Sequence, residues 1–132
     1  MSTKSDDRGL NPHENPVARY SIDQMSWLTG AGHAEKTEDI IMNGMLEAIG
    51  IRVSSVTGDP DVTITLTDAN GNEFYNSTAL NDGTDYYYTP SEFLPTAEKM
   101  PLVGPITVGV DPSADAGGSG QDLTVDVDLF IT

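Results

Sequence analysis

The sequence lacks cysteine altogether, and it also lacks any long apolar run. Without cysteine there is no disulfide, no thiolate nucleophile and no zinc site with cysteine ligands. This pattern is typical of a protein that is assembled in a reducing compartment. No stretch reaches the roughly 20 apolar residues of a membrane-spanning helix, and the opening MSTKSDDRGLNPHENP has no apolar core of a secretory signal. We therefore expect no membrane partner and no secretory route.

Basic residues are scarce as well. Six lysines and arginines stand against 21 aspartates and glutamates, which gives a net charge of −15. Such a chain repels the phosphates of nucleic acids, so we expect no nucleic-acid partner. The charge is uneven, because residues 1–36 hold four basic and five acidic residues, whereas residues 37–132 hold two basic and 16 acidic ones. A body of this charge repels its own copies, which indicates a salty or divalent-rich medium or a docked position that offsets the repulsion.

Residues 1–36 show no sustained periodicity and are interrupted by prolines and glycines, which predicts an extended N-terminal arm. Its one apolar cluster lies in SIDQMSWLTG and comprises Ile22, Met25, Trp27 and Leu28. Trp27 has two open interpretations: it packs on the chain's own body, or it anchors the arm on a partner, since buried tryptophan is a frequent hot spot of interfaces. We take these four residues as the candidate partner-binding site.

The segment TEDIIMNGMLEAIGIRVSS at residues 37–55 fits two structures. As a helix it places several apolar side chains on one face and a glycine just after its end, namely Ile41, Met45, Ala48, Ile49 and then Gly50. As a strand it alternates over residues 49–53, and Gly44 marks a bulge or a close approach. Periodicity alone does not decide residues 38–49.

The rest of the chain is predicted to be β-structure. VTITLTD alternates apolar and polar residues, Asn70-Gly71 is a hairpin signal, and Thr89 with Glu92 fits the capping box of a short helical turn. The closing LTVDVDLFIT directs Leu123, Val125, Val127, Leu129 and Ile131 inward. The sequence therefore predicts an all-β fold: a single antiparallel β-sandwich or small jelly roll over residues 37–132, preceded by the arm.

Metal and cofactor sites lack support in the sequence. Asp68, Asn70 and Asn72 look like the start of a calcium loop, but the loop positions that need glycine and a bidentate glutamate hold Glu73 and Ala79. The carboxylates of the final strand, Asp122, Asp126 and Asp128, recur on one face. Same-face neighbours on a strand lie roughly 6.5–7 Å apart, too far to hold one ion alone. We interpret them as the solvated face of the strand and expect no metal or cofactor.

Catalytic patterns are also weak. The two histidines, His13 and His33, both lie in the predicted arm, where rigid placement beside a serine is not expected. No glycine-rich segment has the spacing of a phosphate-binding loop. We expect no enzymatic activity. Tyr86-Tyr87-Tyr88 is either a sugar-stacking platform or, as alternate tyrosines of a strand usually are, divided between one core position and two surface positions.

From Val62 to the end, the order of short segments resembles that of small virion proteins of tailed bacteriophages, described as capsid decoration, cement or head-stabilisation proteins. These segments are VTITLTDANGNEFY, the aromatic DYYY, MPLVGPITVGV, a glycine-rich gap and LTVDVDLFIT. Residues 40–53 align with the long first strand of such proteins, so the resemblance covers about residues 40–132 and favours strand at residues 40–53. The arm has no counterpart in it.

This resemblance implies a structural protein that binds the outer surface of a phage capsid and stabilises it. Its partners would be the major capsid protein and copies of itself, with a trimer as the implied assembly. It would be located on the exterior of a virion that is assembled in the host cytoplasm, with the acidic body facing solvent and the arm holding the shell. Two alternatives stay open: a stand-alone β-sandwich module that binds carbohydrate or a host surface, and another accessory protein of a phage head or tail.

Overall fold

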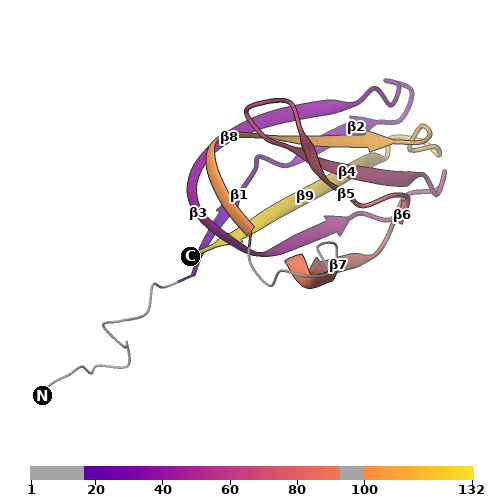
Figure 1. Cartoon of the computed structure of the whole chain (residues 1–132). Coiled ribbons are helices and arrows are strands. Elements are labelled where there is room, and N and C mark those ends of the chain that lie inside the picture. Colours follow the sequence, from indigo (N-terminus) through magenta and orange to yellow (C-terminus); the bar gives the residue numbers. More distant parts are fainter. Residues whose placement is uncertain (1–16, 93–99) are drawn as a thin grey trace, which may run out of the picture.

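The computed structural model describes residues 17–92 and 100–132, which form nine antiparallel strands and one short 3-10 helix (Figure 1). The elements are β1 (Ala18–Ser21), β2 (Met25–Leu28), β3 (Lys36–Val53), β4 (Asp61–Thr67), β5 (Glu73–Asn76), β6 (Leu80–Asn81), β7 (Asp85–Tyr88), η1 (Pro90–Glu92), β8 (Met100–Pro112) and β9 (Asp122–Ile131). The predicted all-β antiparallel sandwich is confirmed.

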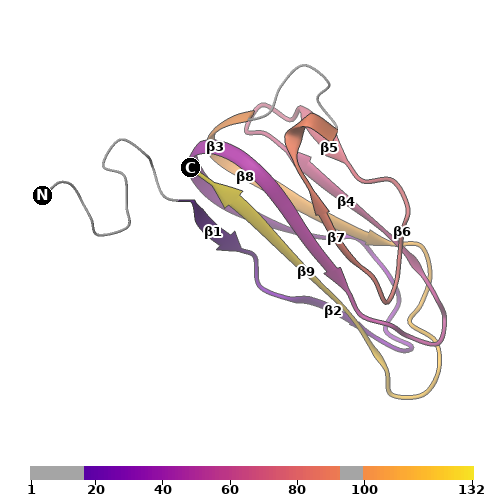
Figure 2. The same cartoon turned by 90° about the horizontal axis from the view of Figure 1, so that it is seen from below.

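The strands follow the order β1-β9-β3-β8-β4-β5 in one continuous hydrogen-bonded sheet. The short strands attach to this path, because β2 pairs with β9, β6 with β4 and β7 with β3. The sheet folds over along β3, so that β7, β9, β1 and β2 form one layer with the second half of β3. The first half of β3 forms the other layer with β8, β4 and β5 (Figures 1 and 2).

The long strand β3 changes layers at Leu46, which pairs with Met100 of β8 on one edge and with Ile131 of β9 on the other. A register shift lies between Leu46 and Ala48, and it reverses which parity faces inward. Before it the buried side chains are Met42 and Leu46, and after it they are Ile49, Ile51 and Val53. Ala48, at the shift itself, is buried as well. Residues 38–49, which fit both helix and strand, are therefore strand throughout, and their alternation is broken by the bulge.

Alternating side chains from both layers form one core. On β9 the five residues predicted to point inward are all buried: Leu123, Val125, Val127, Leu129 and Ile131. They pack in one cluster with Val62, Ile64 and Leu66 of β4 and with alternate residues of β8. Burial of this apolar surface is the main stabilising contribution to the fold.

Residues 17–36 lie along the sheet. β1 pairs with β9 from Ala18 opposite Ile131 to Ser21 opposite Asp128, and β2 continues on the same edge of β9. β3 begins at Lys36, so the structure has no break at the predicted boundary between residues 36 and 37. This corrects the expectation of an extended arm for the described part of it. The physical reason is that β9 would otherwise expose an unpaired edge, which β1 and β2 cover. Residues 1–16 lie outside the described residues.

Both short turn signals are confirmed. The N–H of Gly71 donates to the carbonyl of Asp68 at 3.1 Å, and Gly71 has a positive φ of 85°. At η1 the N–H of Thr89 donates to Glu92 Oε1 at 2.9 Å, which is one half of a capping box.

Candidate binding surfaces

The four residues predicted to bind a partner do not form one exposed patch. Ile22, Met25 and Trp27 are 5%, 7% and 4% exposed, and only Leu28 is open to solvent, at 51%. Trp27 Nε1 donates to the carbonyl of Ala34 at 2.8 Å, and Lys36 Nζ lies 5.0 Å from its ring centroid. The structure thus shows the first of the two interpretations of Trp27, in which it packs on the chain's own body. The binding of a partner by Leu28 stays a prediction.

The carboxylates of β9 lie on the outward face, as predicted, but this face is not uniformly solvated. Asp122 is exposed, whereas Asp128 is only 7% exposed. Arg52 of β3 lies 3.7 Å from a carboxylate oxygen of Asp126 and 3.7 Å from one of Asp128, and Gln24 donates to Asp126 at 3.2 Å. The reason is that β9 is a central strand, so that side chains of β3 and of the β1–β2 connection cover its outer face. Within the described part of the chain no group of three acidic or histidine side chains could hold a metal ion.

Of the three consecutive tyrosines, two pack against the core and one is exposed, which is the reverse of the usual one core and two surface positions. Tyr86 and Tyr88 pack against the core and stack on one another, with ring centroids 6.0 Å apart and planes 14° apart. Tyr87 is 63% exposed, and its ring meets that of Phe130 at 5.8 Å and 58°. Only Tyr87 is therefore available to a ligand on the outer surface.

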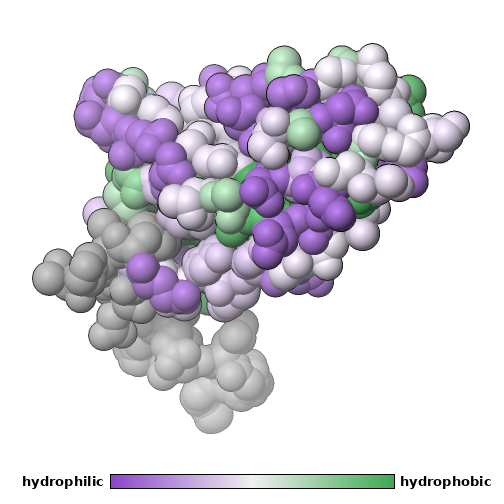
Figure 3. Space-filling model, turned by 90° about the vertical axis from the view of Figure 1, so that its right-hand side faces the viewer, coloured by the Kyte–Doolittle hydropathy of each residue, from purple (hydrophilic) through white to green (hydrophobic). Residues whose placement is uncertain are grey.

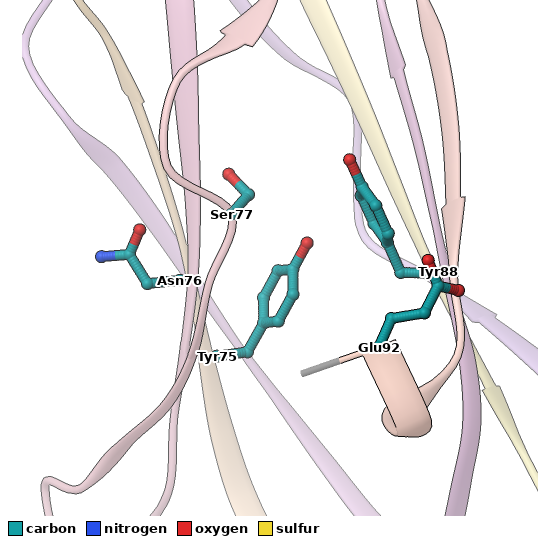
Figure 4. Close-up of a pocket in the computed structure, with 5 residues that line it drawn as sticks. All are labelled: Tyr75, Asn76, Ser77, Tyr88 and Glu92. Carbon is teal, nitrogen blue, oxygen red and sulfur yellow. The ribbon is translucent and has the colours of Figure 1, made fainter. Parts of the chain in front are cut away.

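A pocket of about 200 Å³ opens between β5 and β7, and it is lined by Tyr75, Asn76, Ser77, Tyr88 and Glu92 (Figure 4). Two of its polar groups already have partners in the chain, since Glu92 accepts from Thr89 and Ser77 Oγ accepts from the N–H of Ile64 at 2.8 Å. Burial raises the pKa of the Tyr75 hydroxyl, so it stays protonated. Glu92 and Ser77 therefore offer a ligand in this pocket less hydrogen-bonding capacity than free side chains would.

Two large aliphatic side chains lie on the surface and are mostly exposed to solvent. Ile41 of β3 is 73% exposed and Val103 of β8 is 74% exposed. Ile41 pairs with Pro105 and Asn43 pairs with Val103, so the two aliphatic side chains are diagonal neighbours on one face. Together with the exposed Pro101 and Pro105 they form a surface that we call the bend patch.

The bend patch adjoins a second pocket of about 280 Å³, which is lined by Asp68, Ala69, Asn70, Phe74, Met100, Pro101, Leu102, Val103 and Ile106. Here β8 is an edge, because within the described residues no strand pairs with residues 100–106 on the side away from β3. Pro101 and Pro105 have no N–H to donate, so this edge is a poor template for an added strand. A partner would meet this surface through side chains.

The opposite end of the sandwich is acidic. Four connecting segments meet there: residues 29–35, 54–61, 82–85 and 111–122 (Figure 1). They hold eight carboxylates and no lysine or arginine: Glu35, Asp59, Asp61, Asp82, Asp85, Asp111, Asp115 and Asp122. Hydrophilic residues are spread over this loop end, with small apolar patches between them (Figure 3).

Asp115 connects two segments of the loop end. Its carboxylate accepts from the N–H of Gly30 at 3.0 Å and from that of Gly117 at 2.9 Å. The bond from Gly117 comes first among the causes that hold the pKa of Asp115 below its usual value, followed by the bond from Gly30. Hydrogen bonds to a carboxylate favour its charged form, so the connection depends on ionised Asp115.

We expect acid to loosen this connection. Since the folded-state pKa of Asp115 is lowered, its contribution to stability is present above its unfolded-state pKa and is lost as the pH falls through the folded-state value. The protection factors of the Gly30 and Gly117 amides, which correct for the slower intrinsic exchange in acid, should fall in that window when followed by NMR. In Asp115→Asn the same amides should show no such step. An Asp115 carboxyl that titrates at the ordinary value would contradict this assignment.

None of the helices in the described part of the chain is long and apolar enough to cross a membrane. No family model and no curated protein matches the chain. Solved structures with a similar fold include VP2 of infectious bursal disease virus in a subviral particle, with a TM-score of 0.40, 17% identity and coverage of 96% of this chain and 37% of that one. They also include the SPBc2 prophage-derived protein YomS, with a TM-score of 0.43, 13% identity and coverage of 88% and 99%. A third is the Yersinia pseudotuberculosis-derived mitogen, with a TM-score of 0.38, 10% identity and coverage of 89% and 86%.

Its structural neighbours thus include a viral structural protein and a prophage protein, and the chain spans about a third of the length of the viral one. The identities and TM-scores are too low to carry an argument about function.

Proposed function

We propose that the chain is a non-enzymatic structural protein of a phage virion, which binds the outer surface of the head and stabilises it. The observation that carries the proposal is the separation of two kinds of surface on one sandwich. The bend patch, with Ile41 and Val103 each more than 70% exposed, lies at the end where β3 changes layers. The loop end, with eight carboxylates and no lysine or arginine, lies at the other (Figures 1 and 3).

This separation suits a protein that docks by one end. Covering an exposed aliphatic side chain removes apolar surface from water, which favours binding by about 25 cal/mol per Å². Carboxylates are best left hydrated, and the loop end keeps them away from the docked surface. The described residues carry three basic and 17 acidic side chains, so the body would project a hydrated, strongly negative surface from the particle.

The expected partners are the major capsid protein and further copies of the chain on the same lattice. Copies that carry the same high charge repel each other in solution, and a shell that presents many fixed sites offsets this repulsion. Weak single contacts would add through avidity when several copies assemble as one unit, for which we propose a trimer. The resemblance of residues 40–132 to capsid decoration proteins supports the same partner class.

The experiment that tests the proposal is co-sedimentation with expanded phage heads that have been stripped of their small proteins. We expect saturable binding of the full chain, and loss of at least tenfold in affinity for Ile41→Asp combined with Val103→Asp. Each buried aliphatic side chain contributes about 1.5–3 kcal/mol, and 1.4 kcal/mol corresponds to a factor of ten. Because both side chains are exposed, the variant should fold normally.

The matched control is Leu28→Asp, which places a charge on the exposed residue of the sequence-predicted anchor. It should bind heads like the parent chain if the bend patch docks. If Leu28→Asp loses binding and the double variant keeps it, docking belongs to the strand β2 and the assignment of the bend patch fails.

A further inference from the structure

A row of three residues crosses the outer face of the layer formed by β7, β3 and β9, which run side by side in Figure 2. Tyr87 of β7 pairs with Gly50 of β3, and Gly50 pairs with Asp128 of β9. Paired residues of neighbouring strands direct their side chains to the same face, and strands are about 4.8 Å apart. Tyr87 and Asp128 therefore flank a position that carries no side chain. We call this surface the Gly50 saddle.

One side of the saddle is aromatic. Tyr87 is 63% exposed, and its ring lies at 58° to that of Phe130 with centroids 5.8 Å apart. A Cβ added at Gly50 would make ordinary van der Waals contacts, 3.4 Å from the Phe130 ring and 3.8 Å from Cβ of Asp128, so these two side chains lie against the glycine. An exposed aromatic face beside a glycine floor is a surface on which a flat, partly apolar ring can lie.

The other side of the saddle is polar and has unused hydrogen-bonding capacity. Asp128 is 7% exposed, yet its closest cationic partner is Arg52 Nη1 at 3.7 Å, which is longer than a hydrogen bond. Arg52 Nη2 lies at the same distance from Asp126, and no shorter hydrogen bond engages Arg52 or the Asp128 carboxylate within the described residues. A buried carboxylate normally has donors within hydrogen-bonding distance, so the Asp128 carboxylate has room to accept a hydrogen bond from a further donor.

We propose that the Gly50 saddle binds a neutral glycan. The C–H face of a pyranose ring would lie on Tyr87, one hydroxyl would donate to Asp128 and a neighbouring hydroxyl would accept from Arg52. Vicinal hydroxyls match this arrangement because each both donates and accepts, whereas carboxylates only accept and guanidinium groups only donate. The saddle lies away from the bend patch, so a chain docked on a head through that patch would present it to solvent.

The charge of the chain decides between ligand classes. Sugars with carboxylates, sulfates or phosphates would meet a described surface with 17 acidic and three basic side chains and would be repelled. Arg52 already neutralises part of the charge of Asp126 and Asp128. A cationic ligand would have to displace Arg52 from these two carboxylates. A neutral polyhydroxylated ring avoids both penalties.

A printed array of defined neutral and acidic oligosaccharides, probed with the full chain, tests this inference. We expect saturable binding to at least one neutral oligosaccharide, confirmed by titration in solution. Tyr87→Ala should weaken that binding at least tenfold, and Arg52→Lys should also weaken it because the fork of donors is lost. Tyr20→Ala, which removes another exposed tyrosine at 37% exposure, is the matched control and should bind like the parent chain.

Binding should also shift the NMR signals of Gly50 and Phe130, which no surface contact elsewhere would do. Three results would overturn the inference: no neutral oligosaccharide binds at millimolar concentration, the acidic sugars bind best, or Tyr87→Ala binds as tightly as the parent chain. Since Tyr87 is exposed, the Tyr87→Ala chain should fold, and its far-UV circular dichroism would verify this.

Discussion

Trp27→Ala should lower the free energy of unfolding by about 3–5 kcal/mol, the usual cost of removing a large buried aromatic side chain. Trp27 is 4% exposed, it packs in the same cluster as the core residues of β9, and its indole N–H donates to Ala34. A domain of this size is stable by only about 5–15 kcal/mol, so the variant should lose a large share of its stability. Urea denaturation followed by far-UV circular dichroism measures the change without relying on tryptophan fluorescence.

The neighbouring residue provides the control. Leu28 follows Trp27 on β2 but points to the other side and is 51% exposed, so Leu28→Ala should change the free energy of unfolding by less than about 0.5 kcal/mol. If Trp27→Ala were as stable as the parent chain, residues 17–36 would not be part of the core in solution. They would then act as the extended arm that the sequence alone suggests.

Gly44→Ala should destabilise the fold more than the same substitution at Gly50, the other glycine of β3. A Cβ at Gly44 would lie 2.5 Å from Cγ2 of Ile131 and 2.6 Å from the carbonyl oxygen of Thr132, which belongs to the backbone. Met45 and Thr132 exchange hydrogen bonds at 2.9 and 3.0 Å, so the end of β9 cannot move away without breaking them. Overpacking of this kind costs about 1–3 kcal/mol, measurable as a lower urea midpoint.

Gly50→Ala is the matched substitution, because it adds the same methyl group to the same strand. There the nearest atom would be 3.4 Å away, in the Phe130 ring, which is an ordinary contact. We expect its urea midpoint to stay near that of the parent chain. Equal midpoints for the two alanine variants would contradict the close approach of β9 to β3 at the bend.

Long alternation was the part of the fold that the sequence predicted well. The residues of β9 alternate over ten positions without a bulge, and every residue of their predicted inward set is buried, with Asp128 the one further buried residue of the strand. At β3 the bulge between Leu46 and Ala48 reverses the parity, so the same rule gave no decision for residues 38–49. This strand is stabilised by pairing with two different neighbours, β8 and β9. Local propensity and periodicity carry no information about that pairing.

The short strands β1 and β2 could not be predicted from the sequence for a different reason. β1 and β2 have four residues each, and the β9 residues that they pair with lie about 100 positions further along the chain. A four-residue alternation is too short to distinguish from a polar segment with a few apolar residues, and here it was assigned to an extended arm. The apolar cluster was identified correctly, but its burial could not be predicted.

The surfaces with functional interest depend on register. Tyr87, Gly50 and Asp128 come from three strands, and only the pairing of β7 and β9 with β3 brings them into one row. The tyrosines were noticed from the sequence, whereas Phe130 and Arg52 gave no signal as part of a site. The bend patch was missed because the parity that exposes Ile41 can be assigned only when the position of the bulge is known.

A role of the chain in strengthening a phage head is tested most directly by heating. Expanded heads stripped of their small proteins would be heated with and without a saturating amount of the chain, while release of packaged DNA is followed with a fluorescent dye. We predict that the chain raises the temperature of release and that the variant with Ile41→Asp and Val103→Asp does not. Release at the same temperature with and without the parent chain would contradict a role in stabilising the head.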